Sequence, residues 1–116
     1  MENKTVSWQK RFGFTVCAAD AVEKKIPAKA LGVAVIFEPT ETGEKIFLVI
    51  ESRASGLRAH CVKRLTTGKL PPVASLKVAF KAVELADASP ESVKAACREQ
   101  LILTGELRRE LRPAMR

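Results

Sequence analysis

The strongest constraint on the fold is a β-hairpin in the middle of the chain. Residues 32–38 (GVAVIFE) and 44–51 (EKIFLVIE) are rich in β-branched and aromatic side chains, and the five residues between them, PTETG, are typical of a turn. Both faces of the second run are apolar, with Ile46, Leu48 and Ile50 on one face and Phe47 and Val49 on the other. We therefore expect Glu44 to Glu51 to be an interior strand of a sheet that is covered on both faces.

The segments on either side of the hairpin carry weaker signals. Residues 12–18 have the composition of a strand, and residues 18–26 have a short helical pattern that Pro27 ends. Residues 57–65 (LRAHCVKRL) fit two patterns. As a strand they bury every second residue from Leu57, and as a helix they align Leu57, Cys61 and Leu65. Turn-like Ser-Gly and Thr-Gly pairs on either side favour the strand.

The C-terminal part has a helical period. Residues 73–87 are apolar around most of a helix circumference, which predicts a largely buried helix. Ser89-Pro90-Glu91 is a helix start signal, with a serine cap, a proline at the first helical position and an acidic first turn. The helix that it opens should bury Val93, Ala96, Cys97 and Leu101. Gly105 is expected to weaken or kink that helix before Pro113.

The chain of 116 residues suits a single domain, and 47% of its residues are hydrophobic, as in globular proteins. No repeat, linker or low-complexity stretch divides it. The sequence thus predicts one small α+β domain over residues 1–116, in which an antiparallel β-meander with the central hairpin 32–51 packs against C-terminal helices.

The net charge of +7 comes from one part of the chain. Between Ser52 and Val83 there are seven basic residues and no acidic one, whereas the other 13 basic residues are balanced by 13 acidic ones. The positive potential of such a segment favours the binding of polyanions. The alternative interpretation is that the segment forms a solvated surface that binds no ligand. The basic side chains that we expect to contact phosphates are Arg53, Arg58, Lys63, Arg64 and Lys69.

The N-terminal aromatic residues have two interpretations. Phe12-Gly13-Phe14 partly resembles the aromatic strand motif of RNA-recognition and cold-shock proteins, but Arg11 stands where that motif has a glycine and no second aromatic strand follows. We therefore expect these phenylalanines to belong to a core strand. Trp8 either stacks on bases or interface groups, or caps the edge of the core.

Nothing in the sequence indicates an enzyme. Cys17, Cys61 and Cys97 are isolated from one another, so neither a disulfide framework nor a metal site is expected, and no cofactor motif is present. His60 and Cys61 are adjacent, and adjacent side chains diverge too far to form a catalytic pair. With no signal peptide or membrane span evident, we expect a reduced, cytoplasmic protein.

Two functions fit these observations. The first is a small basic nucleic-acid-binding protein that contacts DNA or RNA phosphates without base specificity, through the segment from Ser52 to Val83. The second is a protein-interaction or regulatory module, as a homodimer or a subunit of an assembly, whose basic face meets an acidic protein partner. We favour the first, because a small basic protein without catalytic residues fits it better.

Overall fold

The chain combines four strands with helices in its described part. The computed structural model describes residues 8–52, 56–67, 70–83, 85, 87 and 89–114. In chain order its elements are α1 (Trp8–Arg11), β1 (Thr15–Ala18), η1 (Ala19–Ala21), α2 (Val22–Lys25), β2 (Leu31–Thr40), β3 (Gly43–Glu51), α3 (Leu57–Thr67), η2 (Val73–Ser75), β4 (Lys77–Val83) and α4 (Pro90–Leu111).

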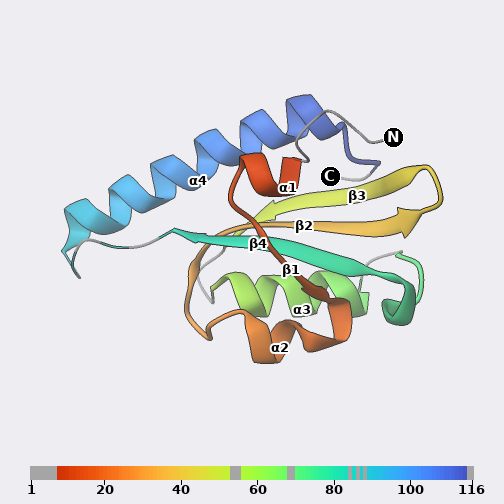
Figure 1. The fold of residues 1–116 in the computed structure, drawn as a ribbon. Helices are drawn as coiled ribbons and strands as arrows, with labels where there is room; N and C mark the ends of the chain where they lie inside the picture. The colour runs from red at the N-terminus through yellow and green to blue at the C-terminus, as the bar shows by residue number, and fades with distance from the viewer. Residues whose placement is uncertain are drawn as a thin grey trace.

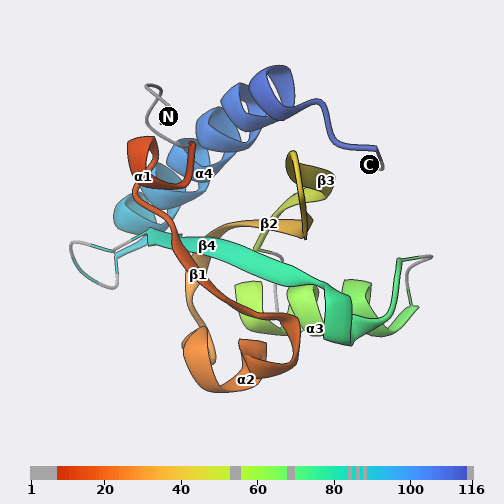
Figure 2. The same cartoon turned by 45° about the vertical axis from the view of Figure 1, so that its right-hand side comes forward.

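The four described strands form one antiparallel sheet in the order β1-β4-β2-β3. Helices α1 and α4 cover one face, and α2 and α3 cover the other (Figure 1). Both layers keep these positions when the molecule is turned (Figure 2). The structure thus confirms an α+β fold in which the hairpin of residues 32–51 belongs to an antiparallel sheet packed against a C-terminal helix.

Strand β2 lies between β4 and β3, and its residues Val33 to Phe37 are all buried. Ala34 and Ile36 belong to the core cluster beneath α2 and α3, whereas Val33, Val35 and Phe37 belong to the cluster beneath α1 and α4. Alternate residues of a strand point to opposite faces, so this one apolar run supplies both cores.

Strand β3 differs from the prediction in two respects. It pairs with β2 and both of its faces are covered, but it stands at the end of the sheet order and is therefore not an interior strand. A β-bulge lies between the pairs Ile36–Leu48 and Phe37–Ile46. The extra residue shifts the alternation by one, so Phe47 joins the α2–α3 core and Ile46 joins the α1–α4 core, the reverse of the predicted faces.

The outer edge of β3 is partly covered by the C-terminal segment. The Arg108 guanidinium donates to the carbonyl oxygen of Val49 at 2.9 Å. The backbone amide of Ala114 donates to the carbonyl oxygen of Ile46 at 3.0 Å. Exposed strand edges invite pairing with other chains, and these contacts occupy two acceptors of this edge.

The first strand is shorter than the predicted range of residues 12–18. Strand β1 begins at Thr15, and Phe12 and Phe14 lie in the turn that follows α1, where their amides donate to the carbonyl oxygens of Trp8 and Gln9. Both phenylalanines are half-buried and pack against the α1–α4 core. They therefore contribute to the core as expected, but from a turn and not from a strand.

The prediction of a strand over residues 57–65 is wrong, and the helical alternative holds. Leu57 and Cys61 are fully buried beneath the sheet and Leu65 packs beside them, whereas Ala59, which a strand would have buried, is exposed. The helix turns the three apolar residues to the core and leaves Ala59 and Lys63 in solvent, whereas a strand would turn all five to the same face.

The helix predicted over residues 73–87 is also wrong, because residues 77–83 form β4. This strand lies between β1 and β2, so it has a core on each face: Val78 and Phe80 point to one, and Ala79 points to the other. An apolar run that is buried all round has the same composition in a strand as in a helix, and periodicity alone does not distinguish the two.

Helix α4 begins as predicted. The Ser89 hydroxyl accepts a hydrogen bond from the amide of Ser92 at 3.2 Å, and Pro90 occupies the first turn. The helix runs through Gly105 without a break and ends where Arg112 adopts a left-handed conformation.

The buried side of α4 differs from the predicted one. Of the four residues expected in the core, Ala96 is buried and Cys97 is half-buried, whereas Val93 and Leu101 are exposed. The buried side instead continues through Gln100, Thr104 and Leu107, and the side-chain carbonyl oxygen of Gln100 accepts from the Ser52 hydroxyl at 2.7 Å. A polar contact thus fixes α4 over the end of β3, at a position that hydrophobic periodicity does not reveal.

Gly32 provides a test of the strand packing. A Cβ added there would lie 2.2 Å from the carbonyl oxygen of Lys81 on β4. We expect Gly32→Ala to lower the free energy of unfolding by about 3 kcal/mol, because the two backbones must separate. Urea denaturation measures this loss.

Gly43→Ala is the matched control. Gly43 has a φ of +148°, close to the +157° of Gly32, but no described atom lies within 4 Å of its added Cβ. Both variants place an alanine at a positive φ, which costs a similar free energy in each. Only Gly32→Ala also brings its Cβ into a clash with the backbone of β4. An equal loss of stability in the two variants would contradict the close approach of β2 and β4.

Candidate functional site

The structure places the predicted phosphate contacts only in part on one surface. Arg58, Lys63 and Arg64 lie on α3, whereas Arg53 and Lys69 lie outside the described residues. Lys63 is exposed, and Arg58 and Arg64 are half-buried. The Arg58 Nε donates to the carbonyl oxygen of Ile26 at 2.8 Å, so this arginine also ties α3 to the end of α2.

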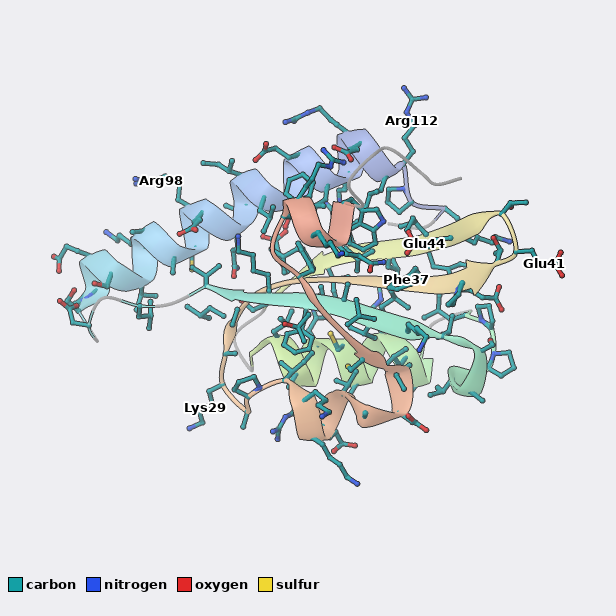
Figure 3. All side chains as sticks on the ribbon, viewed as in Figure 1. Lys29, Phe37, Glu41, Glu44, Arg98 and Arg112 are labelled. Atoms are coloured by element: carbon teal, nitrogen blue, oxygen red, sulfur yellow. The ribbon has the colours of Figure 1, made fainter. Side chains whose placement is uncertain are left out.

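Helix α3 has basic neighbours that the sequence analysis missed. Residues 19–30 and 57–67, here called the α2–α3 layer, hold two acidic side chains and six basic ones, namely Lys24, Lys25, Lys29, Arg58, Lys63 and Arg64. The net charge of this layer is +4, whereas that of residues 31–51 is −3. Figure 3 shows Lys29 projecting away from the sheet on this side of the molecule. Packing of α2 against α3 therefore joins the two basic groups into one face.

The remaining described lysines of the acid-free segment lie elsewhere. Lys77 is exposed at the start of β4, and Lys81 is half-buried later in the same strand. Lys81 lines a groove between α1, β4 and α4, on the sheet face opposite to α3. The segment from Ser52 to Val83 is consequently divided between the two sides of the sheet, and only its α3 part contributes to the α2–α3 layer.

An apolar groove runs between α2 and α3. It has a volume of about 230 Å³, and its walls are formed mostly by Val22, Val62, Leu65 and Val73, with Asp20, Glu23 and Thr66 also lining it. A hollow of this size accepts an apolar side chain or a small ligand group. The basic face is therefore not uniformly polar.

Trp8 belongs to the core, which is the second of the two alternatives for this residue. It is 8% exposed and makes edge-to-face contacts with Phe14 and Phe37, at centroid distances of 5.7 and 5.8 Å. Its Nε1 donates to the Glu44 carboxylate at 2.7 Å, and Gln9 donates to the same carboxylate. The indole thus anchors α1 to β3 and does not present a face to bases.

The groove between α1 and α4 has a mixed lining and a volume of about 400 Å³. Phe12, Ile102 and Leu103 supply its apolar part, and charged side chains of both signs surround them. Arg11 at its rim pairs with Glu110 of α4, and the Arg11 guanidinium lies 5.5 Å from the centre of the Phe12 ring.

The histidine and two of the three cysteines are buried. The Nδ1 atom of buried His60 donates to the carbonyl oxygen of Glu51 at 2.7 Å. Burial raises the pKa of Cys61 to about 12 and also raises the pKa of Cys17. Among the described residues, no three His, Cys, Asp or Glu side chains come together as metal ligands would.

Comparison of the chain with protein-family models, curated proteins and solved structures finds no significant match. None of the helices in the described ranges combines the length and the hydrophobicity of a membrane span. The functional interpretation therefore rests on the charges, grooves and contacts of this chain.

The cysteines give a direct test of the core. At pH 8 a thiol with a pKa of about 12 is ionised in roughly one molecule in ten thousand, so Cys61 should resist an aromatic disulfide reagent. We expect half-buried Cys97 to react first and Cys61 to react only after unfolding. Mass spectrometry of the labelled native and urea-unfolded protein identifies the sites. Labelling of Cys61 as fast as Cys97 in the native protein would contradict its burial.

Proposed function

We propose that the protein binds nucleic acid through the α2–α3 layer, by contacts between basic side chains and phosphates. The observation that carries this proposal is the net charge of +4 on one helical layer of a small domain. Such a face attracts a polyanion, and lysine and arginine contacts with phosphates position nucleic acid without reading its sequence. The isolated cysteines, of which Cys17 and Cys61 are buried and Cys97 is half-buried, fit a reducing compartment, and we propose the cytoplasm as the site of action.

The side chains of the layer are suited to phosphate contacts. Lys24, Lys25, Lys29 and Lys63 are exposed, and flexible lysines adapt to a backbone whose sequence they do not read. The aromatic residues support the absence of base specificity. Trp8 is in the core, and Phe12 and Phe14 are half-buried against the α1–α4 core, on the other side of the sheet.

A second candidate is an acidic protein partner that binds the same layer. The apolar groove between α2 and α3 favours it, because a phosphate backbone has no group to fill a hollow lined by Val22, Val62 and Leu65. A protein would place an apolar anchor there and direct its carboxylates to the lysines beyond the groove, because Asp20 and Glu23 line the groove itself. The two candidates therefore differ in whether the groove contributes to binding.

Nucleic-acid binding should depend steeply on salt. A footprint of about four contacts gives a log–log slope of the association constant against salt near −4 on duplex DNA. Replacing Lys24, Lys25 and Lys63 by glutamine should weaken binding alike for all sequences and flatten this slope by about two to three units. Fluorescence anisotropy with single-stranded and duplex DNA and RNA at several salt concentrations measures both quantities.

The matched control removes the same charge from the opposite side of the molecule, by changing three exposed residues of α1 and the end of α4 to glutamine: Lys10, Arg109 and Arg112. This variant should keep a slope close to that of the parent. The proposal fails if the parent does not bind at low salt, or if the two triple variants lose affinity equally.

The groove separates the two candidates. Thr66 is exposed on its rim, so Thr66→Arg should block it and leave the basic face intact. If an acidic protein is the partner, a polyglutamate peptide with one central leucine should bind the parent more tightly than polyglutamate alone, and Thr66→Arg should remove the difference. If nucleic acid is the ligand, its affinity should not fall in Thr66→Arg. Isothermal titration calorimetry measures the peptides, and anisotropy measures the nucleic acid.

A further inference from the structure

One row of side chains on the outside of α4 has an unusual charge order. Its members are spaced four residues apart and are all exposed: Lys94, Arg98, Ile102, Glu106 and Glu110. Residues at this spacing follow one another along a helix surface, so they form a continuous ridge. The ridge carries two positive charges, one large apolar side chain that is 58% exposed, and two negative charges, in that order. Below it is called the α4 row.

The helix itself does not explain this order. A helix dipole favours acidic side chains near the N-terminus and basic side chains near the C-terminus, and the α4 row has the reverse. Arg98 and Glu106 are eight residues apart, about 12 Å along the axis, which is too far for a contact within the helix. Neither forms an ion pair with another residue in the described part of the chain, whereas Glu110 pairs with Arg11. Figure 3 shows Arg98 pointing away from the molecule.

The row matches an antiparallel copy of itself. If two α4 helices cross antiparallel with Ile102 of each on the two-fold axis, Arg98 of one faces Glu106 of the other. This pair occurs twice by symmetry. A parallel arrangement would instead bring like charges together.

We propose that the α4 row is a homodimer interface, in which two copies of the chain pack their α4 helices antiparallel around Ile102. Ridges of residues four apart pack into each other at a crossing angle of about −50°, the commonest class in globular proteins. An isologous contact of this kind closes on itself and forms a dimer and no larger polymer.

The surface beside the row has room for the partner. Arg98, Ile102 and Glu106 form part of the rim of the groove between α1 and α4, which has a volume of about 400 Å³ and an apolar floor that includes Phe12 and Leu103. Side chains of the second copy that flank its own row would enter this groove. The α2–α3 layer lies on the opposite face of the sheet, so this proposal does not depend on nucleic-acid binding.

Complementary charge variants test the interface. Arg98→Glu and Glu106→Arg should each weaken self-association by roughly thirtyfold, because two attractive contacts become repulsive at once. In an equimolar mixture of the two variants, the glutamate introduced at position 98 faces the arginine introduced at position 106, and the native Glu106 of the first variant faces the native Arg98 of the second. The mixture should therefore form a heterodimer with an affinity near that of the parent. Sedimentation velocity from micromolar to submillimolar protein measures all four samples.

Leu101 and Ile102 provide the matched apolar pair. Both are 58% exposed, but they are adjacent, so they point about 100° apart around the helix. Ile102→Asp should abolish the dimer and Leu101→Asp should leave it intact, with circular dichroism showing that both variants are folded. The proposal is overturned if the parent stays monomeric at submillimolar concentration, if the mixture of charge variants stays monomeric, or if Leu101→Asp acts like Ile102→Asp.

Discussion

Burial of both faces of β2 is the interaction on which the other parts of the structure depend. Residues Val33 to Phe37 are all at most 2% exposed, and each large apolar side chain among them contributes roughly 1.5 to 3 kcal/mol when it is buried. Five consecutive buried residues require cover above and below the sheet, and the chain supplies it with α1 and α4 on one side and α2 and α3 on the other. The two helical layers then become the two outer surfaces of the protein.

The sequence predicts the elements whose signals are local. The hairpin has turn residues between two apolar runs, and α4 has a serine cap followed by proline, so both are found where they are expected. The two errors of element type concern segments whose identity is decided by tertiary position. Residues 77–83 form a strand because β1 and β2 pair with them on both sides. Residues 57–65 form a helix, which turns Leu57 and Leu65 to the core and leaves Ala59 and Lys63 exposed, whereas a strand would turn all four to the same face. The bulge at Phe47 cannot be predicted from the sequence, because residues 46–50 are all apolar and the pattern does not show where the alternation of faces shifts.

The candidate site follows the same pattern. The basic character of α3 can be seen in the sequence, because no acidic residue interrupts it. The contribution of Lys24, Lys25 and Lys29 cannot be seen in the sequence. Asp20 and Glu23 balance part of their charge along the chain, and only the packing of α2 against α3 brings these lysines close to α3. The position of Lys81 on the far side also depends on the sheet, since β4 directs alternate side chains to opposite faces.

These surfaces give the protein two independent faces, a basic layer proposed to bind phosphates and a self-complementary helix proposed to pair with a second copy. A two-dimensional ¹H–¹⁵N NMR titration tests this division most directly, because it reports on every amide in one experiment. The account predicts that nucleic acid, added at low salt and fixed protein concentration, shifts the amides of α2 and α3, whereas dilution of the protein alone shifts the amides of α4. Shifts confined to α4 on adding nucleic acid, or no shifts in α2 and α3, would contradict it.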